Sequence, residues 1–232
     1  MQAVVLAGGL ATRLGERCAT TPKYLLEIAG RPFAEWQLLR IAACGFDEVL
    51  LCVGHLGEAI ERRLGDGASL GVRLSYAYDG PEPLGTAGAL RRTVDQLQDT
   101  FLVTYGDSYL PFDYAAPLGD LNRSPKALGT MAVFHNCGRW DRSNTSIEDG
   151  WVVAYAKGAA PGAHAYIDYG ATAYRREAIA ALAPAHRDLA LVQKYLAEQR
   201  KLRAFVADER FHEIGSPRGL AELDALLSRG GP

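Results

Sequence analysis

A glycine pair, an arginine and a lysine near the amino terminus are residue types that can hold phosphate groups. Gly8 and Gly9 follow an apolar run, Arg13 lies four residues further on, and Lys23 comes directly after Pro22. Glycine has no Cβ, so successive backbone N–H groups can approach a phosphate closely. Arginine adds a planar fork of donors, and lysine adds a mobile charge behind a backbone that the proline restricts. This pattern predicts a phosphate-binding loop.

Two common phosphate-binding motifs are absent from this sequence. The loop contains no Gly-x-Gly-x-x-Gly, and no glycine-lysine pair occurs in the chain to make a P-loop. Gly8-Gly9 alone would also suit an ordinary tight turn. The complete spacing, Gly-Gly-x-x-x-Arg followed by Pro-Lys, is what favours a phosphate site.

A second glycine-containing segment, from Glu82 to Leu90, lies where a predicted strand leads into a predicted helix. Gly85 and Gly88 would let the backbone approach a flat base or ribose, and Thr86 supplies a hydroxyl near the helix start. An ordinary helix start capped by Thr86 is the alternative interpretation. Further along, Asp107 follows a predicted strand and a glycine, which places a carboxylate at the ligand end of a sheet. A plain turn aspartate is the alternative there.

These motifs, in this order, resemble the signature of the sugar-1-phosphate nucleotidyltransferases over essentially the whole chain, from Gln2 to about Leu227. The resemblance implies that Arg13 and Lys23 bind the triphosphate and that Asp107 is a ligand of Mg²⁺. It also implies a nucleotide-binding set made of Leu6, Ala7, Gly8, Gly9, Glu82, Gly85 and Thr86. One departure is Ala11, where the family usually has glycine.

Two later segments extend the resemblance. Glu213 resembles the acid of the family's Asp-x-Gly-Thr-Pro segment, which implies a second Mg²⁺ ligand. Glutamate is one methylene longer than aspartate, so coordination through water is favoured over direct coordination. Lys157 matches a family lysine that grips the sugar phosphate, although Ala156 replaces the glutamate that often precedes it. A solvated lysine is the alternative interpretation.

The segment from Ile167 to Gly170 occupies the family's sugar-contact position, where Asp168 and Gly170 are expected to bind the sugar phosphate substrate. Its amino-acid sequence resembles that of D-glycero-D-manno-heptose 1-phosphate guanylyltransferases. The sequence from Glu82 to Leu90 resembles that of enzymes that make GDP-mannose-type sugars. GTP and this heptose 1-phosphate are therefore the expected substrates. Mannose or another hexose 1-phosphate with GTP, UTP, CTP or dTTP is the alternative, and a turn aspartate is the alternative for Asp168.

The implied reaction needs no general base. A phosphate monoester has a second pKa near ~6, so the attacking sugar phosphate is already ionised at neutral pH. The difficulty is to bring two anions together, which requires positive charge and positioning. This agrees with the absence of a convincing Ser/His/Asp set in the sequence.

Composition excludes several other classes. The 232 residues carry 25 basic and 27 acidic side chains without charged runs, which argues against nucleic acid or anionic membrane as a partner. The four cysteines form no CxxC pair, and no signal peptide is apparent, so we expect a cytoplasmic location. Homo-oligomerisation is left open.

Alternating patterns of apolar residues indicate the elements that must position these side chains. In the first 110 residues, strands are predicted over 2–7, 48–53, 72–78 and 101–105, and helices over 34–44, 56–64 and 86–98. Later strands are predicted over 127–135, 151–155, 166–174, 202–206 and 210–214, and later helices over 187–200 and 219–227. This alternation predicts an α/β, Rossmann-like, mostly parallel mixed sheet with helices on both faces. We expect one domain over 1–232 and no C-terminal β-helix.

Two rival functions share features with this sequence. A metal-dependent glycosyltransferase would carry Asp-x-Asp, but the segment after Gly106 reads Asp107-Ser108-Tyr109 and lacks the second acid. A catalytically silent regulatory subunit that binds nucleotide sugar is supported by Ala11, Ala156 and Glu213. Retention of Arg13, Lys23 and Asp107 argues against it.

Overall fold

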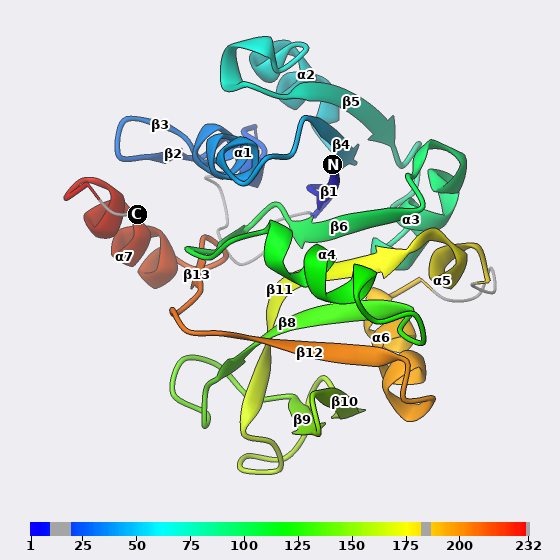
Figure 1. Ribbon diagram of the computed structural model, residues 1–232. Helices are drawn as coiled ribbons and strands as arrows, with labels where there is room; N and C mark the ends of the chain where they lie inside the picture. Colours follow the sequence, from blue (N-terminus) through cyan, green and yellow to red (C-terminus); the bar gives the residue numbers. More distant parts are fainter. Residues whose placement is uncertain (10–19, 182–186, 231–232) are drawn as a thin grey trace. The chain divides into compact units, whose positions relative to one another are not determined.

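The computed structural model describes residues 1–9, 20–181 and 187–230 (Figure 1). These residues divide into two compact units. The first unit contains Met1–Pro83, Thr104–Pro111 and Phe211–Pro232, and the second contains Leu84–Val103 and Phe112–Arg210. The expectation of a single domain over 1–232 stays a prediction.

The sheet of the first unit is parallel. Its strands β1 (Gln2–Leu6), β4 (Glu48–Val53) and β5 (Arg73–Tyr78) lie in the order β5-β4-β1, with Val4 opposite Leu50 and Leu50 opposite Ser75. β1 and β4 are almost completely buried apolar runs, as expected for parallel strands covered on both faces. The last two residues of β6 (Thr100–Tyr105) also belong to this unit.

Three α-helices and two short strand pairs accompany this sheet in the described part of the first unit. The helices are α1 (Phe33–Ala43), α2 (Gly57–Leu64) and α7 (Pro217–Leu227). α7 begins where the Ser216 side chain accepts a hydrogen bond from the Gly219 backbone N–H, a standard N-cap followed by proline. The strand pairs are β2 (Glu27–Ile28) with β3 (Arg31–Pro32), and β7 (Ser108–Tyr109) with β13 (His212–Glu213).

The sheet of the second unit is mixed. Its order is β6-β11-β8-β12-β10-β9, in which β6 contributes Thr100–Val103. The other strands are β8 (Gly129–His135), β9 (Thr145–Glu148), β10 (Trp151–Tyr155), β11 (Tyr166–Arg175) and β12 (Leu202–Ala207). β8 and β12 are parallel, and the pairs β11–β8, β10–β12 and β10–β9 are antiparallel. The register of β11 shifts between Asp168 and Thr172, which marks a bulge.

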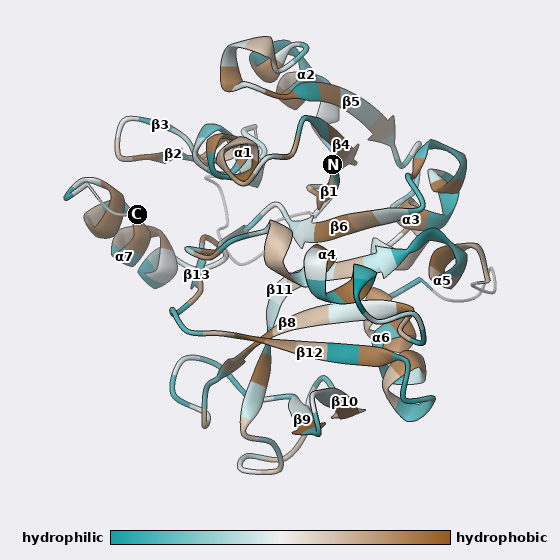
Figure 2. Ribbon diagram, in the orientation of Figure 1, coloured by the Kyte–Doolittle hydropathy of each residue, from teal (hydrophilic) through white to brown (hydrophobic). Residues whose placement is uncertain are grey.

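Helices cover the sheet of the second unit. α4 (Ala115–Asn122) packs on β8, β11 and β12 and is drawn in front of them in Figure 1, whereas α6 (Leu189–Glu198) packs on β10 and β12. α3 (Thr86–Arg92) and α5 (Arg176–Ala180) contact each other. Hydrophobic colour extends along most of β8 and β12 in Figure 2. Phe112 lies in the core among aromatic rings, with centroids 5.1 Å from Tyr114 and 5.0 Å from Tyr169.

Most predicted elements are confirmed within one or two residues, and the differences have local causes. The helix predicted over 86–98 ends at Arg92, because the Thr93 hydroxyl donates to the carbonyls of Ala89 and Leu90 and a 3-10 turn follows. The segment predicted as a strand over 210–214 forms only the short pair with β7. α4, α5, β9 and the β2–β3 hairpin were not predicted. None of the helices in the described ranges has the length and hydropathy needed to cross a membrane.

Candidate functional site

The predicted site residues fall into two groups, one in each unit. In the first unit, the loops after β1 and β4 approach each other closely. A Cβ added to Gly54 would lie 3.0 Å from the Gly8 carbonyl oxygen, and one added to Gly8 would lie 3.3 Å from the Gly54 nitrogen. Gly9 is exposed and has open space around its Cβ position. A side chain at Gly8 would therefore be tightly packed, whereas Gly9 leaves the backbone open to a ligand.

Leu6 and Ala7 place this loop at the carboxyl end of the sheet. The Ala7 N–H donates to the Cys52 carbonyl across 2.8 Å, and the Gly106 N–H donates to the Leu6 carbonyl across 3.0 Å. A Cβ on Gly106 would lie 3.0 Å from the Ala7 Cβ. Close packing of these two strand ends brings the residue after Gly106 to the ligand end of the sheet, as the sequence predicts.

That residue, Asp107, forms an ion pair with Lys23. The Lys23 Nζ donates to Asp107 Oδ2 across 2.7 Å, and the Ser108 hydroxyl donates to Asp107 Oδ1 across 3.2 Å. The Lys23 side chain is only 12% exposed, and Asp107 is 40% exposed. The carboxylate therefore has one side in the protein and one side open to solvent.

Two side chains of α1 hold the loop that carries Asp107. Nε2 of the fully buried Gln37 donates to the carbonyls of Tyr105 and Ser108, both across 2.8 Å. Arg40 Nε donates to the Leu110 carbonyl across 2.9 Å. Sequence reasoning missed both residues, because the polar side chains of a predicted surface helix are expected to face solvent. The fully buried residues of α1 are instead Phe33, Ala34, Gln37, Leu38 and Ile41.

Glu213 lies beside the Asp107 loop, but its carboxylate is engaged elsewhere. The Ile214 N–H donates to the Asp107 carbonyl across 2.9 Å, and Glu213 pairs with Ser108 in the strand register. Glu213 Oε1 accepts from the Ser216 hydroxyl across 2.5 Å, and Oε2 accepts from the Gly215 N–H. The carboxylate thus sits at the N-terminus of α7, where the helix dipole favours negative charge.

The sequence also singles out Glu82, Arg13 and Ala11, and it predicts a metal site. Glu82 is exposed in the segment that follows β5. Arg13 and Ala11 lie outside the described residues. Among the residues that are described, no group of three or more His, Cys, Asp or Glu side chains is arranged to hold a metal ion. Mg²⁺ often takes only one or two protein carboxylates and completes its shell with substrate phosphates and water, so Asp107 suits it.

In the second unit, the start of α3 packs against the segment before α6. Gly85 has a φ of 76°, and a Cβ there would lie 2.4 Å from the Arg187 carbonyl oxygen. The Ala87 N–H donates to that same carbonyl across 3.0 Å. Thr86 does not cap its own helix: its hydroxyl accepts from the Leu189 N–H across 2.8 Å. The glycine is therefore already required by contacts inside this unit.

Asp188, which sequence reasoning missed, joins this helix start to Lys157. The Lys157 Nζ lies 3.2 Å from Asp188 Oδ1 and 3.3 Å from Oδ2. Burial alone would raise the pKa of Asp188, but the Ala190 N–H, the Lys157 ammonium and the Thr86 hydroxyl together lower it. The available signal was its place directly before an apolar helix, where aspartate is a preferred N-cap.

Asp168 faces partners inside the second unit. Its Oδ1 accepts from the Gly170 N–H across 2.9 Å, and Oδ2 accepts from the Tyr155 hydroxyl and Gln193 Nε2, both across 3.3 Å. Burial raises the pKa of Asp168 by more than these donors lower it. Gly170 has a φ of 93° and lies within the β11 bulge. The structure brings Asp168 and Gly170 together, with the carboxylate held by internal hydrogen bonds.

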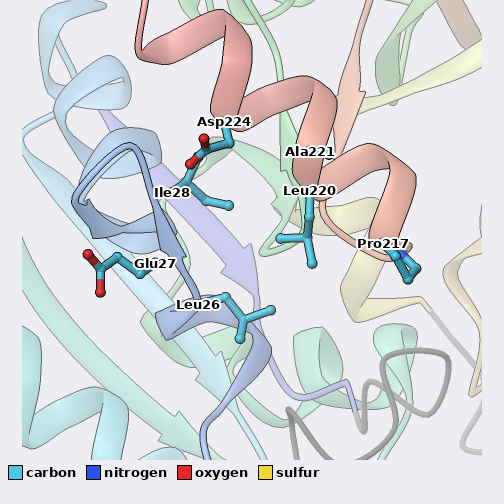
Figure 3. Close-up of a pocket in the computed structure, with 7 residues that line it drawn as sticks. All are labelled: Leu26, Glu27, Ile28, Pro217, Leu220, Ala221 and Asp224. Atoms are coloured by element: carbon cyan, nitrogen blue, oxygen red, sulfur yellow. The ribbon is translucent and has the colours of Figure 1, made fainter.

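An apolar pocket of the first unit lies between the β2–β3 hairpin and α7, with a cavity volume of about 260 Å³ (Figure 3). Leu26 and Ile28 of the hairpin side and Leu220 of α7 point into it, whereas Glu27 points away. Its only charged lining residues are the acids Glu27 and Asp224. Such a lining repels phosphates, so this pocket is not part of the predicted site.

The family described as MobA-like NTP transferase domain matches residues 3–213. The chain belongs to this family. This NTP transferase domain is 37% identical to the N-acetylmuramate alpha-1-phosphate uridylyltransferase of Neisseria meningitidis over 130 residues, which are 54% of this chain and 55% of the relative. It is 34% identical to the D-glycero-alpha-D-manno-heptose 1-phosphate guanylyltransferase of Campylobacter jejuni over 113 residues, 49% of this chain and 50% of the relative. The match thus spans about half the length of these relatives.

The fold of this NTP transferase domain has solved counterparts. HddC from Yersinia pseudotuberculosis superimposes with a TM-score of 0.79, covering 97% of this chain and 98% of that chain at 22% identity. This likeness confirms the predicted fold class, an α/β mixed sheet flanked by helices of the nucleotide-diphospho-sugar transferase type.

Proposed function

We propose that this NTP transferase domain transfers a nucleoside monophosphate from a nucleoside triphosphate to a sugar 1-phosphate and releases pyrophosphate. The observation that carries the proposal is the Lys23–Asp107 ion pair at the carboxyl end of the first unit's parallel sheet. It combines a cation for a polyphosphate with a half-exposed carboxylate for a divalent metal. Sheets of this class bind ligands at that end.

We assign the triphosphate to residues of the first unit. Gly9 offers exposed backbone, and Lys23 offers an ammonium whose position is fixed by Asp107. Leu6, Ala7 and Gly8 shape the loop, and Arg13 is proposed to contribute a guanidinium. Positive charge and fixed N–H groups stabilise the charge that shifts onto the leaving pyrophosphate.

The metal proposed for this reaction is Mg²⁺, held by Asp107 directly and by Glu213 through water. The exposed side of Asp107 offers the hard oxygen that this ion prefers, whereas both oxygens of Glu213 already accept hydrogen bonds. When bound, the ion neutralises phosphate charge. The role of the protein is to keep Asp107 aimed at the triphosphate, and Gln37 does this through the loop carbonyls.

We assign the sugar phosphate and the nucleoside to separate groups of residues. Lys157 is proposed to hold the sugar phosphate, with Asp168 and Gly170 shaping the sugar-contact strand. Glu82, Gly85 and Thr86 are proposed to lie near the base or ribose. Gly85 and Thr86 are already fixed by contacts to Arg187 and Leu189, so they would meet a ligand without much reorganisation.

The proposed chemistry is a single displacement. An ionised oxygen of the sugar phosphate attacks the α-phosphorus, a new P–O bond forms, and the bond between the α-phosphorus and the pyrophosphate oxygen breaks. The attacking oxygen carries no proton at neutral pH, because the second pKa of a phosphate monoester is about 6. The protein therefore has to orient the two substrates and neutralise their negative charge, and it has no proton to remove.

GTP and D-glycero-D-manno-heptose 1-phosphate are the substrates that we favour. The amino-acid sequence of residues 82–90 and 167–170 supports this choice, and the Campylobacter jejuni relative is named for the same heptose. The Neisseria meningitidis relative is named for a uridylyl group and another sugar, so UTP with a different sugar 1-phosphate is the alternative.

The test is pyrophosphate release with GTP, UTP, CTP, dTTP and ATP, each paired with a panel of sugar 1-phosphates. We expect release with at least one pair and the highest kcat/KM with GTP and the heptose 1-phosphate. Release with UTP and another sugar alone would replace the substrate assignment. An absence of release with every pair would overturn the enzymatic proposal and favour a regulatory subunit.

A further inference from the structure

The segment 187–189, which leads into the first residue of α6, contacts two other parts of the second unit. Through backbone and side chains it reaches the start of α3 and the lysine that follows β10. The Arg187 carbonyl accepts from the Ala87 N–H, and the Leu189 N–H donates to the Thr86 hydroxyl. Both contacts place residues of the proposed nucleotide-binding segment against the residue between them, Asp188.

Asp188 makes more contacts than a helix cap requires. A cap side chain accepts one hydrogen bond from the first turn, and here Oδ1 accepts from the Ala190 N–H across 2.9 Å. The same carboxylate also accepts from Lys157 Nζ across 3.2 and 3.3 Å, and from the Thr86 hydroxyl across 3.4 Å. One carboxylate therefore links the start of α6, the start of α3 and the ammonium of Lys157.

The exposure of the pair leaves the ammonium accessible. Lys157 is 54% exposed and Asp188 is 50% exposed. An ammonium has three N–H donors, and two of them suffice for the two carboxylate oxygens. A third can therefore turn to a phosphate oxygen. Without its partner, the long lysine side chain would sample many rotamers and lose conformational entropy when a ligand binds.

We propose that Asp188 is a positioning residue, which holds the Lys157 ammonium ready for the sugar phosphate and fixes it relative to Gly85 and Thr86. This inference rests on the proposed function. Asp188 touches no reacting atom and acts through Lys157. Its loss is expected to weaken capture of the sugar 1-phosphate more than capture of the nucleoside triphosphate.

Asp188→Asn separates this role from simple helix capping. Asparagine is as good an N-cap as aspartate and can still accept from the Ala190 N–H, but it has no charge to hold Lys157. A residue that only caps α6 would tolerate the exchange. If Asp188 positions Lys157, the exchange should impair binding of the sugar 1-phosphate, because the ion pair is lost while the fold is kept.

The experiment measures KM for both substrates and the melting temperature in Asp188→Asn, Lys157→Met and the double variant. Asp99→Asn is the matched control, because Asp99 pairs with Arg176 across 2.6 Å at the surface of the same unit. We expect Asp188→Asn to raise KM for the sugar 1-phosphate about fivefold to tenfold, with KM for the triphosphate within about twofold and an unchanged melting temperature. In the Lys157→Met background, Asp188→Asn should add nothing further, since the two residues act as one unit.

Each other outcome overturns a defined statement. An unchanged sugar-phosphate KM in Asp188→Asn overturns the positioning role while the proposed function stands. Equal effects on both substrates, or additive effects in the double variant, also overturn it, because the carboxylate would then act independently of Lys157. A wild-type chain without pyrophosphate release overturns the proposed function itself and this inference with it.

Discussion

The Lys23 ammonium and the Asp107 carboxylate lie 2.7 Å apart, although the two residues are 84 positions apart in the sequence. Lys23 comes from a 3-10 turn after Pro22, and Asp107 follows β6. The lysine is nearly enclosed, whereas the carboxylate keeps a solvent-facing side. The ion pair thus holds an ammonium and a carboxylate, which is a group of the type that binds divalent metals, next to each other without substrate.

Removal of the lysine charge should reduce activity without unfolding the protein. Lys23→Met keeps much of the apolar stem but cannot neutralise a polyphosphate, and we expect kcat/KM to fall by about a hundredfold. The free energy of unfolding should change little, because Asp107 stays partly solvated. Lys126→Met, at an exposed lysine, is the control. Full activity in Lys23→Met would remove this lysine from triphosphate binding.

Gln37 should contribute both to stability and to activity. Gln37→Leu fills the same buried space but leaves the carbonyls of Tyr105 and Ser108 without their donor. An unsatisfied buried acceptor costs about 1–3 kcal/mol, so urea unfolding should show a loss of about that size or more. Exposed Gln199→Leu should stay within about 0.5 kcal/mol of wild type. If Gln37→Leu is as stable and active as wild type, the Asp107 loop does not depend on this amide.

The buried carboxyl of Asp168 should make stability depend on pH. Its pKa is raised above the ordinary value of 3.8, so between these two pKa values the folded state binds more protons than the unfolded state. Under that condition the free energy of unfolding falls as pH rises. Relative to Asp168→Asn, wild type should therefore lose stability as pH rises from about 3.8 through the raised pKa. Urea unfolding of both proteins at a series of pH values checks this. A difference that stays constant with pH would show that Asp168 titrates at its ordinary value.

The elements that position the site could largely be predicted from the sequence. Buried strands such as β1 and β4 are continuous apolar runs bounded by glycine or charged residues, and that pattern depends on local sequence alone. β7 and its pairing with β13 could not be predicted, because two residues carry no periodic signal and the pairing joins Ser108 to Glu213, far along the chain. The same limit applies to α4, whose Pro117 and Gly119 obscure a helical pattern.

For the candidate site, the sequence indicates which residues are candidates for binding substrate or metal, but not which residues position their side chains. Lys23 and Asp107 belong to motifs, whereas Gln37 looks like any polar residue of an amphipathic helix until its partners are known. Asp188 carries a cap signal, yet its pairing with Lys157 depends on tertiary structure. The glycine at position 85 was attributed to ligand approach, and the structure adds a second reason in the Arg187 carbonyl.

The most direct test of the central claim is Mg²⁺-dependent pyrophosphate release from GTP and D-glycero-D-manno-heptose 1-phosphate by wild type and Asp107→Asn. Asparagine keeps the size of the side chain and can accept from Lys23, but it removes the charge that the metal requires. We predict release by wild type that stops when Mg²⁺ is chelated, and a loss of at least about a hundredfold in Asp107→Asn with an unchanged melting temperature. Equal rates in the two proteins, or release that continues without a divalent metal, would contradict the account.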